Sequence, residues 1–242
     1  MLQVCLNGPR TAADSAAVPV SPAALAEAAQ QAVAAGACDV HVHPKTPCGE
    51  DSLAPQVVAA ALEAVRAVVD VPVGVTTGAW CEPDPAVRAE RVRSWTVLPD
   101  HASVNWHEPG AEAVAAALLE RGIGIEAGIW SGTDAAESFA RSPLAPRVLR
   151  VLAEVMDTDA GSAPPLAREL LTAVAGAAPG RPVLLHGMDG GAWPVLRLAG
   201  ELGLSTRIGI EDTLLLPDGR PATANAQLVS AAATLLSGLP GG

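Results

Sequence analysis

The stretch SPAALAEAAQQAVAAGACDVHVHP, residues 21–44, carries a complete helix signal followed by a strand signal. Ser21 is a residue type preferred just before a helix, and Pro22 suits the first helical position, where a backbone N–H has no partner in any case. Gly36 is suited to end this helix. The run that follows, residues 39–44, is short and apolar apart from Asp39 and its two histidines. A helix followed by a short buried strand is typical of folds in which helices alternate with parallel strands.

The same unit recurs along the whole chain, because Ala- and Leu-rich segments with helical spacing separate further short apolar runs. The eight runs cover residues 2–8, 39–44, 71–78, 102–106, 122–130, 148–155, 181–187 and 206–212. Eight such units in 242 residues predict an α/β fold, a (β/α)8 TIM barrel. No linker or charge block divides the chain, so we expect a single TIM-barrel domain over residues 1–242. An open doubly wound sheet is the alternative, but no GxGxxG follows the first run.

Composition narrows the class of partner. The chain has 50% hydrophobic and 17% charged residues, as globular proteins do, and its net charge of −11 disfavours nucleic acid and anionic membrane surfaces. We therefore expect a small-molecule partner, no nucleic acid and no membrane. No apolar run reaches the roughly 20 residues that span a bilayer, and the first residues lack a charged leader, so we expect a cytoplasmic protein. The four cysteines form no CxxC pair, and we expect free thiols.

Polar residues stand at the ends of nearly all eight runs. In a TIM barrel the carboxyl ends of the strands meet at one face, and that face carries the chemistry. The polar residues at these ends or within the runs are Asn7, His41, His43, Thr76, Thr77, Ser103, Asn105, His107, Glu126, Glu154, His186, Arg207, Glu211 and Asp212.

His41 and His43 lie two residues apart, so a strand points both imidazoles to the same face. Two imidazoles form half of a site for a first-row metal, and a carboxylate from another strand would complete three ligands with one position open. Glu211 is the candidate for that carboxylate. The alternative is that one histidine bonds a backbone carbonyl in the core while the other is solvated.

Glu211 and Asp212 are adjacent, and an ideal strand would point only one of them at the barrel axis. At the end of the last strand, where the chain bends, both can reach the site. With Glu211 on the metal, Asp212 is free to act as a general base, and Arg207 could orient or neutralise it. The alternative is a surface Arg–Asp pair that contributes under about 1 kcal/mol.

Three motifs carry a resemblance to a known family: HVHPK at 41–45, TTG at 76–78, and TRIGIEDTLLLPDGRPATANAQLV at 206–229. With them the chain resembles the β-keto acid cleavage enzymes, the family of 3-keto-5-aminohexanoate cleavage enzyme. The resemblance implies a TIM barrel, homo-oligomeric assembly, and a divalent metal, usually Zn²⁺. It also implies a retro-Claisen reaction, in which a β-keto acid and acetyl-CoA give acetoacetate and a new CoA thioester.

The resemblance also implies roles for individual residues. His41, His43 and Glu211 would bind the metal, Asp212 would be the base with Arg207 as its partner, and Thr76 and Ser103 would hold substrate oxygens. We expect the neighbouring Thr77 to bind substrate as well.

Two departures from the family bear on the substrate. The family often has a glutamate after the first strand that holds the distal group of the substrate, and here that place falls on Arg10, which favours an anionic or neutral distal group over an amine. Lys45 stands where the family commonly has arginine, and it keeps the charge but loses bidentate geometry. Glu154 and His186 either line the substrate pocket or form a structural pair, since an unpaired buried polar group is costly.

Two other functions are compatible with the sequence. A metal-dependent hydrolase of the amidohydrolase type also uses an HxH pair, a further histidine such as His186 and an aspartate on the last strand. In that class HxH belongs to the first strand and a lysine often lies in mid-barrel, whereas here HxH is on the second run and Lys45 is next to it. The other possibility is a barrel that binds a metabolite without converting it.

Overall fold

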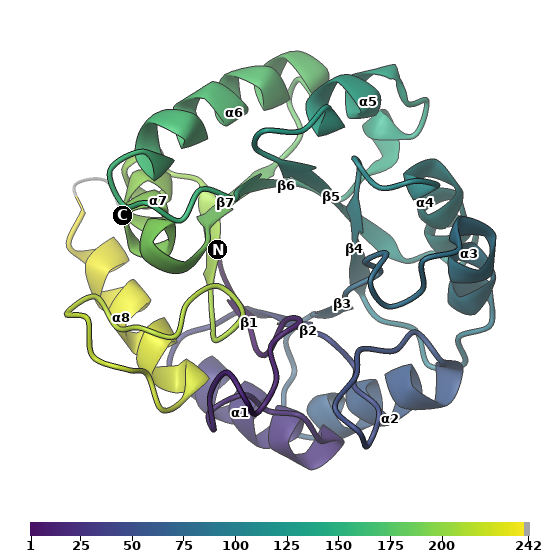
Figure 1. Ribbon diagram of the computed structural model, residues 1–242, viewed down its shortest axis with the longest axis horizontal. Coiled ribbons are helices and arrows are strands. Elements are labelled where there is room, and N and C mark those ends of the chain that lie inside the picture. Colours follow the sequence, from purple (N-terminus) through teal and green to yellow (C-terminus); the bar gives the residue numbers. More distant parts are fainter. Residues whose placement is uncertain (240–242) are drawn as a thin grey trace.

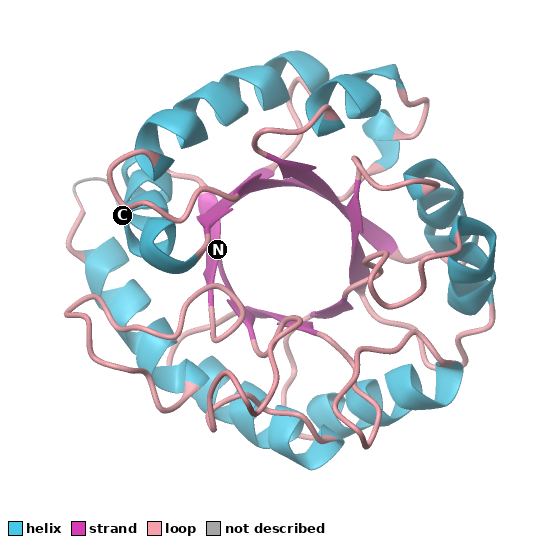
Figure 2. Ribbon diagram, in the orientation of Figure 1, coloured by secondary structure: helices cyan, strands magenta, loops and turns pink. Residues whose placement is uncertain are grey.

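A closed barrel of eight parallel strands surrounded by helices forms residues 1–239, the part of the chain that the computed structural model describes (Figures 1 and 2). The strands are β1 (Leu2–Cys5), β2 (Asp39–Val42), β3 (Val73–Val75), β4 (His101–Asn105), β5 (Gly124–Trp130), β6 (Arg150–Val155), β7 (Val183–Gly187) and β8 (Ser205–Ile208). The helices are α1 (Pro22–Ala34), α2 (Pro55–Arg66), α3 (Pro85–Arg93), α4 (Ala111–Glu120), α5 (Ala135–Arg141), α6 (Ala163–Ala177), α7 (Ala192–Glu201) and α8 (Asn225–Ser237). Two short 3-10 helices, η1 (Ala145–Arg147) and η2 (Asp189–Gly191), precede β6 and α7.

The strands pair in the order of the chain, and β1 closes the ring by pairing with both β2 and β8. Val4 lies beside Val40 on one side and beside Ile208 on the other. The predicted (β/α)8 TIM barrel is confirmed. The closure places the ends of β2 and β8 on either side of β1, although they are far apart in the sequence.

The capping signals that begin the first helix act as predicted. The side chain of Ser21 accepts a hydrogen bond from the backbone N–H of Ala24, and α1 begins at Pro22. Gly36, two residues beyond the end of α1, has a φ of +117°, a conformation that residues with a side chain rarely adopt. The chain can therefore turn sharply from α1 into β2.

A network of charged and polar side chains fills the barrel interior at the amino-terminal end of the strands. Gln3 on β1 donates to Glu126 on β5, across the barrel, at 3.1 Å. Arg150 on β6 bonds Glu126 at 2.7 Å and Asp39 at 2.8 Å. His101 joins the same carboxylates, 3.0 Å from Asp39 and 3.1 Å from Glu126. All five side chains are buried, so they fill the amino-terminal end of the barrel.

The core between strands and helices consists mainly of Val, Leu, Ile and Ala, with Trp95 and Phe139 among the largest buried side chains. All four cysteines are free, as predicted. Within residues 1–239, none of the helices combines the length and the apolar composition that a membrane crossing requires.

Candidate metal centre and active-site cavity

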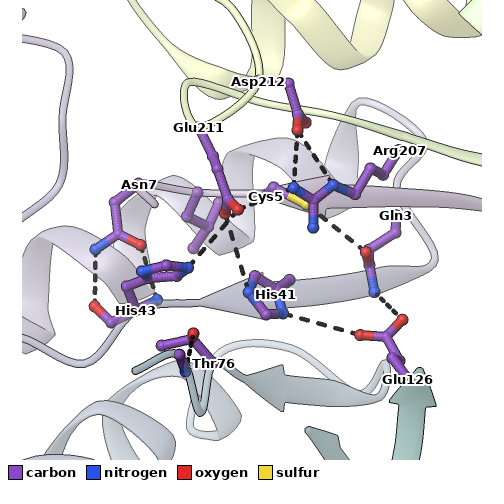
Figure 3. A network of polar contacts seen from close by, with 12 residues as sticks. Gln3, Cys5, Asn7, His41, His43, Thr76, Glu126, Arg207, Glu211 and Asp212 are labelled. Atoms are coloured by element: carbon purple, nitrogen blue, oxygen red, sulfur yellow. Dashed lines mark hydrogen bonds and ion pairs between the residues drawn. The ribbon is translucent and has the colours of Figure 1, made fainter. Parts of the chain in front are cut away.

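Three buried side chains converge at the carboxyl end of the barrel (Figure 3). One ligand atom from each of His41, His43 and Glu211 lies within 4.8 Å of the others. Nε2 of His41 is 4.0 Å from Oε2 of Glu211, and Nε2 of His43 is 3.7 Å from Oε1. The structure thus brings together the three residues that the sequence suggested as metal ligands.

Local geometry explains how these groups reach one point. His41 lies on β2 and His43 just after it, so their rings lie on the same face with centroids 5.3 Å apart. β8 ends at Ile208, and Glu211 and Asp212 occupy the turn that follows. Because they are not on an ideal strand, both carboxylates can contact Arg207.

Gly8 makes room for Glu211. Its φ is +58°, and a Cβ atom at this position would lie 2.4 Å from Cγ of Glu211. Any side chain at residue 8 would therefore be strained and would also collide with the carboxylate. The loop after β1 has to contain a glycine here for Glu211 to approach the histidines.

The donor set fits a divalent first-row metal. Oε2 of Glu211 is buried without a hydrogen-bond partner among the described residues, so this oxygen is available to a cation. Burial lowers the pKa of the His41 imidazole to about 4, which keeps it in the neutral form that binds metal. Burial also opposes the charged form of His43, but the carboxylates of Glu211 and Asp51 outweigh it and raise the pKa of this ring to about 9. A cation between these groups would replace the proton that the carboxylates hold on His43.

Asp51, which the sequence analysis did not single out, lies behind His43. Its Oδ2 is 2.9 Å from Nδ1 of His43 and accepts a hydrogen bond of 2.9 Å from Nε1 of Trp80. Its Oδ1 accepts from the ammonium group of Lys45. No sequence pattern marks Asp51, because it belongs to an irregular loop that folds back so that Lys45 and Asp51 form an isolated bridge.

A chain of contacts leads from Arg207 to Glu154 on the other side of the cluster. Arg207 donates to Oδ1 of Asp212 from Nε at 3.1 Å and from Nη2 at 3.0 Å, and Nη2 also donates to Glu211 at 2.9 Å. His186 lies between two carboxylates, 3.2 Å from Asp212 and 3.2 Å from Glu154. Burial and Arg207 disfavour the charged imidazole, but the bonds to Asp212 and Glu154 outweigh them and raise the pKa of His186.

A cavity of about 320 Å³ lies beside His41, His43 and Glu211. The sequence-predicted residues that line it are His41, His43, Thr76, Ser103, Glu154, Arg207 and Glu211. The rest of the wall is largely apolar and includes Trp130, Leu152, Met156 and Met188. Glu154 thus combines both expectations, since it pairs with His186 and also lines the cavity.

The remaining predicted residues do not line the cavity. His186 and Asp212 are buried behind the wall. The Thr77 hydroxyl donates to the backbone of Ser103 at 2.6 Å, and Lys45 pairs with Asp51. Arg10 is turned away, because its guanidinium donates to Asp189 at 2.6 Å and to the backbone carbonyl of Glu211 at 3.2 Å.

Comparison with known proteins gives a family and a fold. The model of the family described as beta-keto acid cleavage enzyme matches residues 1–240. No curated protein matches the chain. Among solved structures, the binary complex of ObcA with oxaloacetate has a TM-score of 0.75 at 16% sequence identity, over 93% of this chain and 64% of that chain. The ternary complex of ObcA with a C4-CoA adduct and oxalate has a TM-score of 0.73 at the same identity and coverage.

A more distant solved structure, the N-acetylmannosamine-6-phosphate 2-epimerase from Clostridium perfringens, has a TM-score of 0.57 at 13% identity, over 88% of this chain and 87% of that chain. At these identities the structural likeness shows the fold. The chain spans 64% of the length of the ObcA chains in these two complexes.

Proposed function

The chain belongs to the beta-keto acid cleavage enzyme family, and on that premise we propose that it is a metal-dependent enzyme that cleaves a β-keto acid with acetyl-CoA. The bond between the ketone carbon and the carbon that bears the carboxylate breaks. The carboxylate fragment joins the acetyl carbon to give acetoacetate, and the CoA thiolate passes to the acyl group of the substrate. The products are acetoacetate and a new CoA thioester, so all atoms are conserved.

The observation that carries this proposal is the convergence of His41, His43 and Glu211 on the wall of the cavity. A divalent metal held by these three side chains would polarise the ketone oxygen of the substrate. Zn²⁺ suits two imidazoles and a carboxylate, and the cavity beside them leaves space for the substrate.

The other residues are proposed to bind the substrate and to move its proton. Thr76 accepts a hydrogen bond from the Gly78 backbone at 3.1 Å, so its hydroxyl hydrogen is free to donate to a substrate oxygen. Ser103 and Arg207 line the same cavity. Asp212 is the proposed proton acceptor, because its Oδ2 has no hydrogen-bond partner among the described residues.

The cavity wall favours a neutral distal group on the substrate. In the described part of the chain, Arg207 is the one guanidinium or ammonium group on the wall, and it is bonded to Glu211 and Asp212. Arg10, from which the sequence favoured an anionic or neutral group, is bonded to Asp189 instead. An anionic distal group would meet the carboxylate of Glu154, whereas an apolar group would contact Met156 and its apolar neighbours.

The ligands of ObcA support a β-keto acid as the substrate, without bearing on its distal group. Those structures are described as complexes with oxaloacetate and with a C4-CoA adduct and oxalate. Oxaloacetate is a β-keto acid, and the adduct contains CoA. A hydrolase of the amidohydrolase type receives less support, because Lys45, the only lysine, pairs with Asp51 outside the cavity.

Metal analysis and a turnover assay test the proposal together. We expect about one divalent metal per chain in the wild type, and much less in His43→Ala and Glu211→Ala, with turnover reduced roughly 100-fold or more. Asp212→Asn should keep the metal and lose turnover, and Glu120→Gln, on the outer surface, should match the wild type.

Each alternative function has its own outcome. Acetoacetate that appears only with acetyl-CoA supports the proposal, whereas release of an acid without CoA supports a hydrolase. Stabilisation by a β-keto acid without product supports a binding protein. A wild type without stoichiometric metal would falsify the metal-dependent reaction.

A further inference from the structure

The two histidines of the cluster are held in different ways. Nδ1 of His41 has no hydrogen-bond partner among the described residues, and Oε2 of Glu126 is 3.9 Å away from it. Nδ1 of His43, in contrast, lies 2.9 Å from Oδ2 of Asp51. The orientation of the His43 ring is therefore fixed by a hydrogen bond that the His41 ring lacks.

The contact with Asp51 also determines where the hydrogen of His43 lies. An ionised carboxylate only accepts hydrogen bonds, so the hydrogen in this contact belongs to Nδ1. In the neutral ring the lone pair then lies on Nε2, the atom that faces Glu211 at 3.7 Å. Asp51 thus favours the tautomer that a metal beside Glu211 requires.

Asp51 is itself held by two other side chains. Lys45 bonds Oδ1, and Trp80 donates to Oδ2 at 2.9 Å while its ring stacks on His43 with centroids 5.9 Å apart and planes 12° apart. The side chains of Lys45 and Asp51 are 1% and 6% exposed, so the ammonium group compensates the charge of a carboxylate that is buried beside it.

These contacts prevent Asp51 from binding directly to a metal held by His41, His43 and Glu211. Oδ1 is bonded to Lys45, and Oδ2 faces both His43 and Trp80 on the side of the ring opposite Nε2. Asp51 is also absent from the group of side chains whose ligand atoms lie within 4.8 Å of one another in the described residues. Its effect on a metal must pass through His43.

We propose that Asp51 is a positioning residue that, fixed by Lys45 and Trp80, holds His43 in the orientation and tautomer that bind the metal. This inference rests on the proposed metal centre and adds a residue to it. Loss of a side chain that hydrogen-bonds a metal-bound histidine typically lowers the metal affinity by about 10- to 100-fold.

The affinity for Zn²⁺, measured on the full chain by competition with a chelator, tests this inference without an activity assay. We expect Asp51→Ala to weaken Zn²⁺ binding about 10- to 100-fold. The Zn²⁺ affinity of Asp51→Asn, which keeps an acceptor but loses the charge, should lie between those of Asp51→Ala and the wild type. Trp80→Phe keeps the stacked ring and removes one donor to Asp51, so it should lower the Zn²⁺ affinity less than Asp51→Ala does.

A matched control is Asp100→Asn. Asp100 also accepts from a basic side chain, Arg66, and from a backbone N–H, that of Val73, but it precedes β4 at the other end of the barrel. Its substitution should leave Zn²⁺ affinity unchanged. The visible spectrum of the Co²⁺-loaded protein should change with Asp51→Asn and not with Asp100→Asn, because it reports the ligand geometry.

The possible results separate this inference from the proposed function. If the wild type binds Zn²⁺ tightly and both Asp51 variants bind it equally well, Asp51 has no positioning role and the metal centre stands. If the wild type binds no divalent metal, the proposed function and this inference both fail. Should Asp51→Ala not fold, the affinity and spectrum of Asp51→Asn decide.

Discussion

Glu211 can approach the two histidines because residue 8 has no side chain. Gly8 combines a φ of +58° with a potential Cβ position 2.4 Å from Cγ of Glu211. A left-handed conformation costs an ordinary residue roughly 1–2 kcal/mol, and the collision would in addition displace the carboxylate. Gly8, which looks like an ordinary loop glycine in the sequence, therefore controls the geometry of the candidate metal centre.

We predict that Gly8→Ala weakens Zn²⁺ binding at least about tenfold, because the displaced carboxylate no longer reaches the histidines. Gly203→Ala is the matched control, since Gly203 has a similar φ of +66° but its Cβ would meet nothing within 4 Å. Both variants should lose stability through strain, and only Gly8→Ala should lose affinity, as chelator competition measures. Equal Zn²⁺ affinity in the two variants would contradict this explanation.

At the scale of secondary-structure elements, the buried charge network connects strands that are not neighbours in the barrel. His101 on β4 reaches Asp39 on β2, and Glu126 on β5 reaches Gln3 on β1. Gly74 on β3 makes room for this, because a Cβ there would lie 2.1 Å from the His101 ring. The network thus depends on one small residue in the strand between β2 and β4.

The charge of His101 makes the stability of this network depend on pH. Burial opposes the charged ring, but Glu126 and Asp39 outweigh it and raise the pKa of His101 to about 10. The pKa in the folded protein lies above the ordinary value of roughly 6.5. The stabilisation is therefore fully present below about pH 6.5 and is lost as the pH rises through about 10.

We predict that His101→Gln is less stable than the wild type at pH 6 and that the difference becomes smaller towards pH 10. The urea concentration at the midpoint of unfolding, measured for both proteins at pH 6, 8 and 10, checks this. A difference that stays constant or grows with pH would show that the charge of His101 does not stabilise the fold.

At the scale of the whole molecule, a metal bound by His41, His43 and Glu211 would connect the ends of β2 and β8, the two strands that flank β1 where the barrel closes. β1 pairs with β2 and with β8, and the ligands come from β2 and from the turns that follow β2 and β8. The ligands lie at residues 41–43 and 211, so the metal would link distant parts of the chain in the folded state alone. Binding to the folded state alone stabilises it.

We predict that removal of the metal with EDTA lowers the melting temperature. At a free concentration of 100 times Kd, the metal contributes about 2.7 kcal/mol. For a domain of this size that corresponds to a shift of roughly 5–10 °C. Thermal unfolding with Zn²⁺ and with EDTA measures it, and Glu211→Gln should show a much smaller shift. The same shift in Glu211→Gln would indicate that the metal binds elsewhere.

The sequence by itself determined the barrel and pointed to the central residues of the site. Strand and helix periodicity, capping residues and the HxH spacing are local features, so they can be recognised without knowing which segments meet in space. The run at residues 206–212 also suggested that Glu211 and Asp212 both reach the interior, and the turn after β8 lets both contact Arg207. Homo-oligomeric assembly and location in the cytoplasm stay predictions.

Only the tertiary structure decided which side chains face the cavity and which hold others in place. Asp51 reaches His43 because its loop folds back, and Arg10 leaves the cavity because Asp189, which is far away in the sequence, accepts its hydrogen bond. His186 lies between Asp212 and Glu154 because β6, β7 and the turn after β8 are neighbours in the ring. Such contacts depend on loop paths and on strand pairing across long sequence separations, and neither leaves a periodic pattern in the chain.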